Sequence, residues 1–157
     1  MTTTSGAKPA PFWGELHTHS AVSDGNGSME DCFAIARSHL DFWALADHAY
    51  DPAVFSRDYR KQRPDHLLLH EEWPALQRLC REYEAPGRFI PFLAYEWTNF
   101  GYGHHNVYYL DYDQPIRIPP TLPELYASLR GVDALVIPHH TGYPVGICGK
   151  NWDFHDE

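Results

Sequence analysis

The sequence predicts an α/β fold in which strands alternate with helices within one domain. Apolar runs bounded by turn residues alternate with segments of helical periodicity, and no internal repeat interrupts them. The chain has 157 residues, of which 43% are hydrophobic and 21% charged, a composition typical of a packed core. We expect residues 1–11 to form a flexible leader and residues 12–157 to form the domain.

The first elements follow from local patterns. Residues 12–17 read as a strand, and the turn after it leads to Ser28, which can cap a helix together with Asp31. Residues 41–46 form a nearly continuous apolar run, as in parallel strands that are buried on both faces.

The middle of the chain is expected to cross the mouth of the fold before it returns to the sheet. Residues 50–70 are polar and irregular. Residues 71–84 have a helical apolar stripe and end before Pro86 and Gly87, and residues 89–96 form the third expected strand.

The last third of the chain is expected to add two strands and a short helix. Gly101 and Gly103 mark a turn into a strand at residues 105–110. Thr121 and Glu124 can cap a short helix, and a fifth strand is expected at residues 134–138.

Charge and cysteine content exclude several classes of protein. There are 12 Lys and Arg against 21 Asp and Glu, so the net charge is −9, which disfavours general nucleic-acid binding and binding to anionic membranes. No run of 18 apolar residues is present, so no membrane span is expected. The three cysteines have no paired spacing, which favours free thiols and a cytoplasmic location. Cys32 and Cys80 are expected to be buried on helices, and Cys148 to be exposed.

Potential metal ligands follow almost every expected strand. The carboxyl ends of strands in β/α folds meet on one face, so residues that are distant in sequence can share a pocket there. These residues are His17, His19, Asp47, His48, Glu96, His139 and His140.

The spacing of these residues suits a metal site. In an extended strand a period of two places His17 and His19 on the same side, and the Gly-rich turn can fold Asp24 toward them. A turn between Glu96 and His105 brings a carboxylate and an imidazole together. Histidine mixed with carboxylate suits Zn, Mn or Fe.

Each of these features also has a structural interpretation. Asp24 can be a turn former, Asp47 can orient a ligand without binding metal itself, and His104 and His105 can be loop residues stacked on tyrosines. The agreement of five separate segments favours the metal site.

Three motifs together resemble the PHP (polymerase and histidinol phosphatase) domain. They are GELHTHS at residues 14–20, LDFWALADH at residues 40–48 and YEWT at residues 95–98. Residues 103–109, 138–140 and 151–153 are similar to an uncharacterised branch of that family, described only as a domain of unknown function.

The resemblance implies a distorted, TIM-like (β/α)7 barrel that holds two or three divalent ions, Zn, Mn or Fe, and hydrolyses phosphoesters. By position it implies the metal ligands His17, His19, Asp24, His48, Glu96, His105 and His139, with His104 and His140 as the competing members of the two doublets. His17, His19, Glu96 and His139 are the residues that it assigns to catalysis.

The end of the chain departs from the family pattern. Family members close their metal set with a D-x-H motif on a late strand. Here Asp153 and His155 have the right letters but no apolar strand precedes them. With five of seven strands readable, we expect a C-terminally truncated, partial barrel that can self-associate through its open edges.

The leading functional hypothesis is a metal-dependent phosphoesterase that acts on a small phosphorylated substrate through a metal-activated water. A basic cluster either recognises the phosphate or is a solvated surface; it consists of Arg57, Arg60, Lys61 and Arg63. The alternatives are a catalytically incomplete metal-binding module and an α/β binding domain with incidental histidines.

Overall fold

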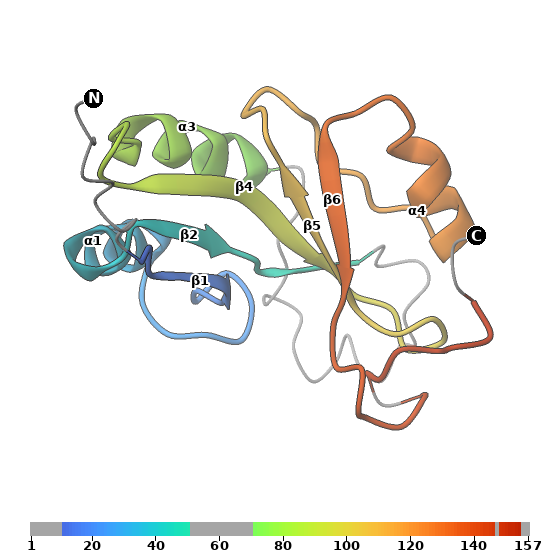
Figure 1. Cartoon of the computed structure of the whole chain (residues 1–157). Coiled ribbons are helices and arrows are strands. Elements are labelled where there is room, and N and C mark those ends of the chain that lie inside the picture. The colour runs from blue at the N-terminus through green and yellow to red at the C-terminus, as the bar shows by residue number, and fades with distance from the viewer. Residues whose placement is uncertain (1–10, 51–70, 147, 155–157) are drawn as a thin grey trace, which may run out of the picture.

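The computed structural model describes residues 11–50, 71–146 and 148–154. Within these residues the chain forms one mixed sheet of six strands and three helices (Figure 1). The expected leader at residues 1–11 lies outside the described residues except for its last residue. The expected basic cluster of Arg57, Arg60, Lys61 and Arg63 also lies outside them.

The sheet has two open edges. Its strands are β1 (Gly14–Thr18), β2 (Phe42–Leu45), β3 (His48–Ala49), β4 (Ile90–Trp97), β5 (His105–Tyr109) and β6 (Ala134–Pro138). The order is β1-β2-β4-β5-β6, and β3 pairs with β4 as a short continuation beyond β2. The first four strands run parallel, whereas β5 is antiparallel to both of its neighbours.

Two of the three helices, α1 and α4, begin at a residue whose side chain caps the helix. In α1 (Met29–His39) the Ser28 hydroxyl accepts from the Asp31 backbone, and the Asp31 carboxylate accepts from the Ser28 backbone. Helix α3 (Trp73–Tyr83) has a proline in its first turn. Helix α4 (Leu122–Ser128) begins at Thr121, whose side chain accepts from the backbone of Glu124.

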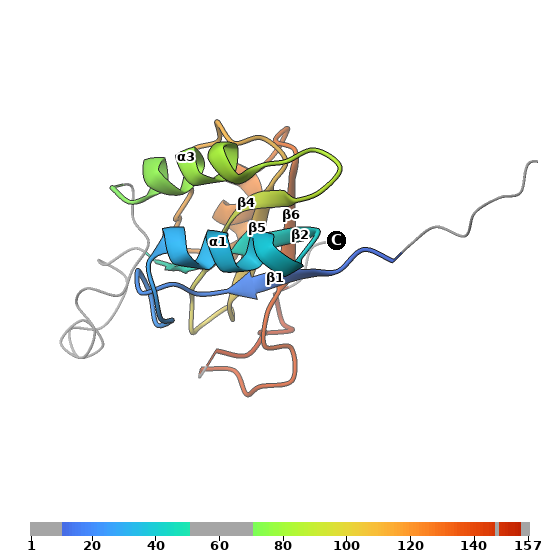
Figure 2. The ribbon, with the colours of Figure 1, turned by 90° about the vertical axis from the view of Figure 1, so that its left-hand side faces the viewer.

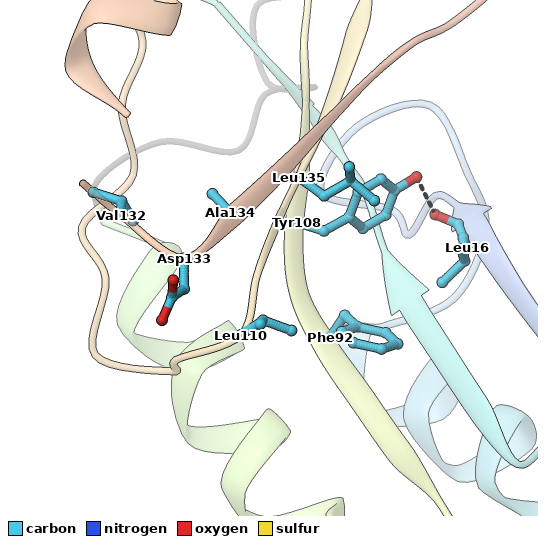
Figure 3. A pocket seen from close by; sticks show the side chains of 8 residues that line it. All are labelled: Leu16, Phe92, Tyr108, Leu110, Val132, Asp133, Ala134 and Leu135. Atoms are coloured by element: carbon cyan, nitrogen blue, oxygen red, sulfur yellow. Dashed lines mark hydrogen bonds between the residues drawn. The ribbon is translucent and has the colours of Figure 1, made fainter. Parts of the chain in front are cut away.

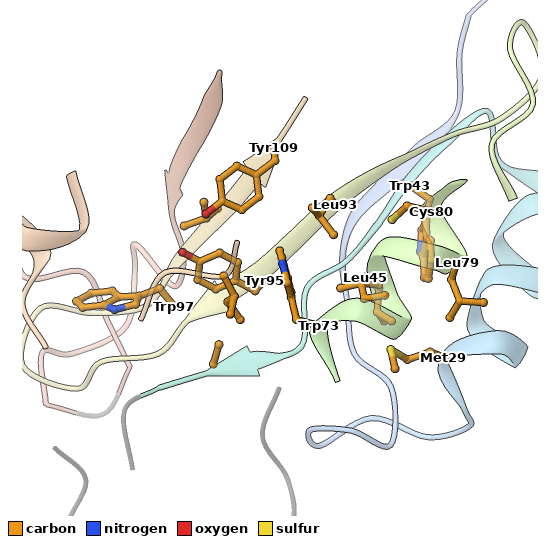
Figure 4. Close-up of a cluster of buried hydrophobic side chains, with 14 of the residues drawn as sticks. Met29, Trp43, Leu45, Trp73, Leu79, Cys80, Leu93, Tyr95, Trp97 and Tyr109 are labelled. Carbon is orange, nitrogen blue, oxygen red and sulfur yellow. The ribbon is translucent and has the colours of Figure 1, made fainter. Parts of the chain in front are cut away.

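One face of the sheet carries the large apolar core. Helices α1 and α3 lie next to each other (Figure 2), and Arg78 of α3 contacts Glu30 of α1 at 3.5 Å. The indole of Trp73, at the start of α3, packs edge-on against Tyr95 of β4, with ring centroids 5.7 Å apart (Figure 4). Tyr95 on β4 and Tyr109 on β5 alternate along their strands with residues that face the opposite side.

The opposite face is lined by smaller side chains near the centre and is partly exposed. Ala44, Ala94 and Tyr108 form a small second cluster, against which Leu16 and Phe92 pack. Two cavities of about 410 and 420 Å³ share Leu16 and Phe92 and follow this face, and Figure 3 shows the first of them.

The mixed α/β class is therefore confirmed, and the strand and helix positions agree with the expected ones to within a few residues. The two-residue strand β3 was not expected from the sequence. The described part is an open sheet and not a closed barrel, since β1 and β6 pair with each other nowhere in it. In this part of the chain no helix is long and apolar enough to cross a membrane.

The cysteines lie in different environments. Cys80 is fully buried on α3, as expected, and burial raises the pKa of its thiol to about 12. Cys32 and Cys148 are both half-buried, so the first is more accessible and the second less accessible than the sequence indicates.

Candidate metal centre

The strand ends bring histidines from several segments to one end of the sheet. His17 lies on β1, His48 begins β3 and Glu96 lies near the end of β4. Because β5 is antiparallel, its beginning lies at the same end, and Glu96 pairs with Asn106 across the two strands. His139 directly follows β6 and donates its backbone N–H to the carbonyl of His104.

The buried carboxylate of Glu96 is the centre of the cluster. Its Oε1 accepts a hydrogen bond of 2.8 Å from Nδ1 of His104. Its Oε2 lies 3.2 Å from Nε2 of His17, 3.3 Å from Nε2 of His19 and 3.2 Å from Nδ1 of His48. Burial raises the pKa of this carboxyl, but the surrounding imidazoles of His104, His17 and His19 outweigh burial and hold the pKa far below its usual range.

The distances between donor atoms suit a divalent cation. Nε2 of His17 lies 2.8 Å from Nε2 of His19, and both lie near Glu96 Oε2. Bonds of about 2.0 Å to one ion place neighbouring ligand atoms about 2.8 Å apart at a right angle and about 3.3 Å apart at the tetrahedral angle. Glu96 Oε2 is also buried without a hydrogen-bond partner among the described residues. The residues present therefore fit a metal ion.

A second group of donors surrounds Asp24. Its carboxylate oxygens lie 3.1 Å from Nδ1 of His19 and 3.6 Å from Nε2 of His48. The imidazole of His48 beside it lowers the pKa of Asp24 to about 2, against the opposing effect of burial. For His19 burial lowers the pKa, but the carboxylates of Glu96, Asp24 and Asp47 together outweigh burial, so the net shift is upward.

Asp47 supports the site from behind. Its buried carboxylate accepts from the backbone N–H of Ser20 at 2.8 Å, from the Ser20 hydroxyl at 2.6 Å and from the Ser23 hydroxyl at 2.5 Å. The Ser23 oxygen lies 3.0 Å from Nδ1 of His19. Asp47 thus holds the loop that orients His19, and it belongs to none of the donor groups formed by the described residues.

Thr98 has the same relation to His48. The buried Thr98 hydroxyl donates to the carbonyl of Glu96 at 3.0 Å, and its oxygen lies 2.8 Å from Nδ1 of His48. A hydroxyl that has already donated its proton must accept, so Nδ1 of His48 carries a proton and Nε2 is left for a ligand. Neither Thr98 nor the two loop serines were identified from the sequence as part of the site.

The structure separates the members of the first histidine doublet. His104 contacts Glu96, whereas His105 points to the helix side, where it donates to the carbonyl of Gly103 at 2.9 Å and packs edge-on against Trp97. Burial lowers the pKa of His105 to about 4. Successive side chains of a strand face opposite sides, so only one member of the doublet can lie in the cluster. The structure brings His104 into it and leaves His105 outside.

Both members of the second doublet lie at the cluster. The ring of His139 stacks on His17 with centroids 3.8 Å apart, and His140 has a left-handed backbone with φ of 53°. In the turn that this conformation allows, the ring centroids of His139 and His140 are 3.6 Å apart. Burial, and then the proximity of His17, lower the pKa of His139 to about 4, while burial lowers the pKa of His140.

Four groups of donors converge within the described residues. They are His17 with His19 and Glu96; His19 with Asp24 and His48; His48 with Glu96 and His104; and Glu96 with His139 and His140. Asp153 is exposed and belongs to none of them, and His155 lies outside the described residues.

The fold and this site together define a candidate α/β metalloprotein with a carboxylate at the centre of a histidine cluster. No protein-family model matches the chain, and no curated protein matches its sequence.

Proposed function

We propose that the protein is a metal-dependent hydrolase of phosphoesters, built on part of a barrel of the PHP type. The observation that supports this most is the buried Glu96 carboxylate, which contacts four imidazoles from three segments of the chain. Burial of a charged carboxylate costs free energy, so its place at the centre of an imidazole cluster points to an ion-binding or functional site.

The donor groups give each residue a role toward two or three divalent cations, Zn, Mn or Fe. His17, His19 and Glu96 would hold one cation, and Asp24 and His48 would contribute to a second. Glu96 can bridge because its two oxygens face different histidines. When bound, the cations would supply Lewis-acid activation of a substrate oxygen and of the attacking water. His139, stacked on His17, would contact the substrate at the rim.

A small phosphorylated substrate fits the charge balance. The chain carries a net charge of −9, and the cluster contains two carboxylates, Asp24 and Glu96. Without cations such a site repels phosphate, whereas two divalent ions add four positive charges to it and attract phosphate.

The test is to measure metal content and hydrolysis together. We expect the purified protein to hold Zn, Mn or Fe in stoichiometric amount and to hydrolyse phosphate mono- or diesters. His17→Ala and His19→Ala should each lose metal and activity, because each removes a ligand beside Glu96. His39→Ala, at an exposed position on α1, is the matched control and should change neither. Full hydrolysis by His17→Ala, or a wild-type protein without bound metal, would contradict the proposal.

A second candidate, a metal-binding module without hydrolase activity, is supported by the position of Asp153. This residue stands in the expected terminal motif but is exposed, and it lies in no donor group among the described residues. The same experiment separates the candidates, since the module predicts bound metal with no hydrolysis of any ester tested.

A further inference from the structure

Asn106 lies directly behind the ring of His17. The side-chain nitrogen of Asn106 is 2.5 Å from Nδ1 of His17, on the side of the ring that faces away from Glu96. Its side-chain oxygen is buried and has no hydrogen-bond partner in the described part of the chain. Since the backbone of Asn106 pairs with Glu96, the sheet itself fixes the amide at this place.

The amide can meet His17 in two ways. An amide presents donors at one end and an acceptor at the other, with nearly the same shape. If its N–H faces His17, then Nδ1 accepts and the ring proton sits on Nε2. If its oxygen faces His17, then Nδ1 carries the proton and Nε2 has a free lone pair.

The neighbouring carboxylate makes the first arrangement coherent. Nε2 of His17 lies 3.2 Å from Oε2 of Glu96, which is buried and has no hydrogen-bond partner among the described residues. A proton on Nε2 of His17 therefore lies beside an anionic oxygen when no cation is bound.

A cation between the rings requires the second arrangement. Nε2 of His17 can bind a metal ion only through its lone pair, so the ring proton must be on Nδ1 and needs an acceptor. Rotation of the Asn106 amide by half a turn supplies its oxygen to Nδ1–H.

We infer that Asn106 is a positioning residue for His17. Rotation of the Asn106 amide by half a turn lets His17 lose the proton on Nε2 and bind a metal ion there. On metal binding, Nε2 gives its proton to water and Nδ1 takes one from water, so His17 is neutral in both states. This inference rests on the proposed metal site, and it concerns how the site is loaded and not which ester it hydrolyses.

Two-bond ¹H–¹⁵N correlation spectra of the histidine rings test the inference directly. The ring signals of His17 are identified by their loss in His17→Gln. We expect the Nε2–H tautomer in protein treated with a chelator. After addition of Zn²⁺ we expect Nδ1–H together with a metal-bound Nε2.

Two substitutions separate the donor from the acceptor. Asn106→Leu removes both and should weaken Zn²⁺ binding by about 10- to 100-fold. Asn106→Asp keeps an acceptor and removes the donor, so His17 should hold Nδ1–H even before Zn²⁺ is added, and Zn²⁺ should bind at least as tightly as in the wild type. Tyr112→Phe is the control, because Tyr112 is another tyrosine whose hydroxyl donates to a backbone carbonyl, that of Pro91. It should behave like the wild type.

The outcomes distinguish this inference from the proposed function. Zn²⁺ binding with the same His17 tautomer before and after addition would overturn the inference alone. So would chelator-treated Asn106→Asp that keeps Nε2–H, or Asn106→Leu with wild-type affinity. A wild-type protein that binds no Zn²⁺ would overturn both the inference and the metal site.

Discussion

The two histidine doublets show what a single residue decides in this site. His104 and His105 are neighbours in sequence, but the first contacts Glu96 and the second packs beside Trp97 on the other face. Side chains alternate between the two faces of a strand, so a register shift of one residue would exchange the member of the doublet that faces the cluster. The sequence therefore identified the doublet as a source of a ligand but assigned that role to His105, the member that the structure places outside the cluster.

Substitution of each member of the doublet tests this assignment. His104→Gln should weaken metal binding by more than about 10-fold, because it removes a donor that touches Glu96. His105→Phe keeps the ring volume beside Trp97 and should leave metal content unchanged. Titration of both variants with Zn²⁺ measures the difference. Weaker binding in His105→Phe than in His104→Gln would reverse the assignment.

Residues that orient the ligands were harder to find than the ligands themselves. Thr98, Ser23 and Asn106 contact histidines through single hydrogen bonds, and none belongs to a residue type that indicates metal. Their role depends on tertiary proximity, since Asn106 is 89 positions from His17. Asp47 was recognisable because it adjoins His48, and both of the roles considered for it were plausible from the sequence.

At the scale of elements, local signals located most of the fold. The pairing of Ser28 with Asp31 predicted the beginning of α1, and the glycines after β4 predicted the turn into β5. Strand β3 was missed because two residues are too few to show any periodicity. The bounds of β6 agree with the expected ones, and those of the other strands differ by one or two residues, which is the usual uncertainty of element boundaries.

The cap of α1 can be tested on its own. Ser28→Ala removes the acceptor for the Asp31 backbone N–H and should lower the free energy of unfolding by about 1 kcal/mol. Urea unfolding followed by circular dichroism measures this. Ser38→Ala, near the other end of the same helix, is the control and should change stability by less. Equal effects of the two substitutions would show that the capping box contributes nothing specific.

At the scale of the whole molecule, the described sheet leaves an edge and an apolar face uncovered. Leu135 and Ile137 on the edge strand β6 are 58% and 37% exposed, and the face beside them contains the cavities that meet at Leu16 and Phe92. Five of the six described strands were readable from sequence, but closure was not, because it depends on pairing between distant edges.

We expect the 157-residue chain to self-associate through β6. An unpaired edge with exposed apolar side chains is a template for pairing with a second copy. Sedimentation velocity over a range of concentrations should show association, and Leu135→Lys or Ile137→Lys should reduce it. Ile35→Lys, at a position 63% exposed on α1, is the control and should not. A wild-type chain that stays monomeric at every concentration would contradict this expectation.

The hairpin of β4 and β5 has a consequence for how the site assembles during folding. It carries Glu96, Thr98, His104 and Asn106, so the carboxylate, one of its histidines and two orienting side chains come from one short segment. Closing so short a loop costs little chain entropy and is fast. The centre of the cluster can therefore form first, and the distant histidines of β1 and β3 then join a carboxylate already in position.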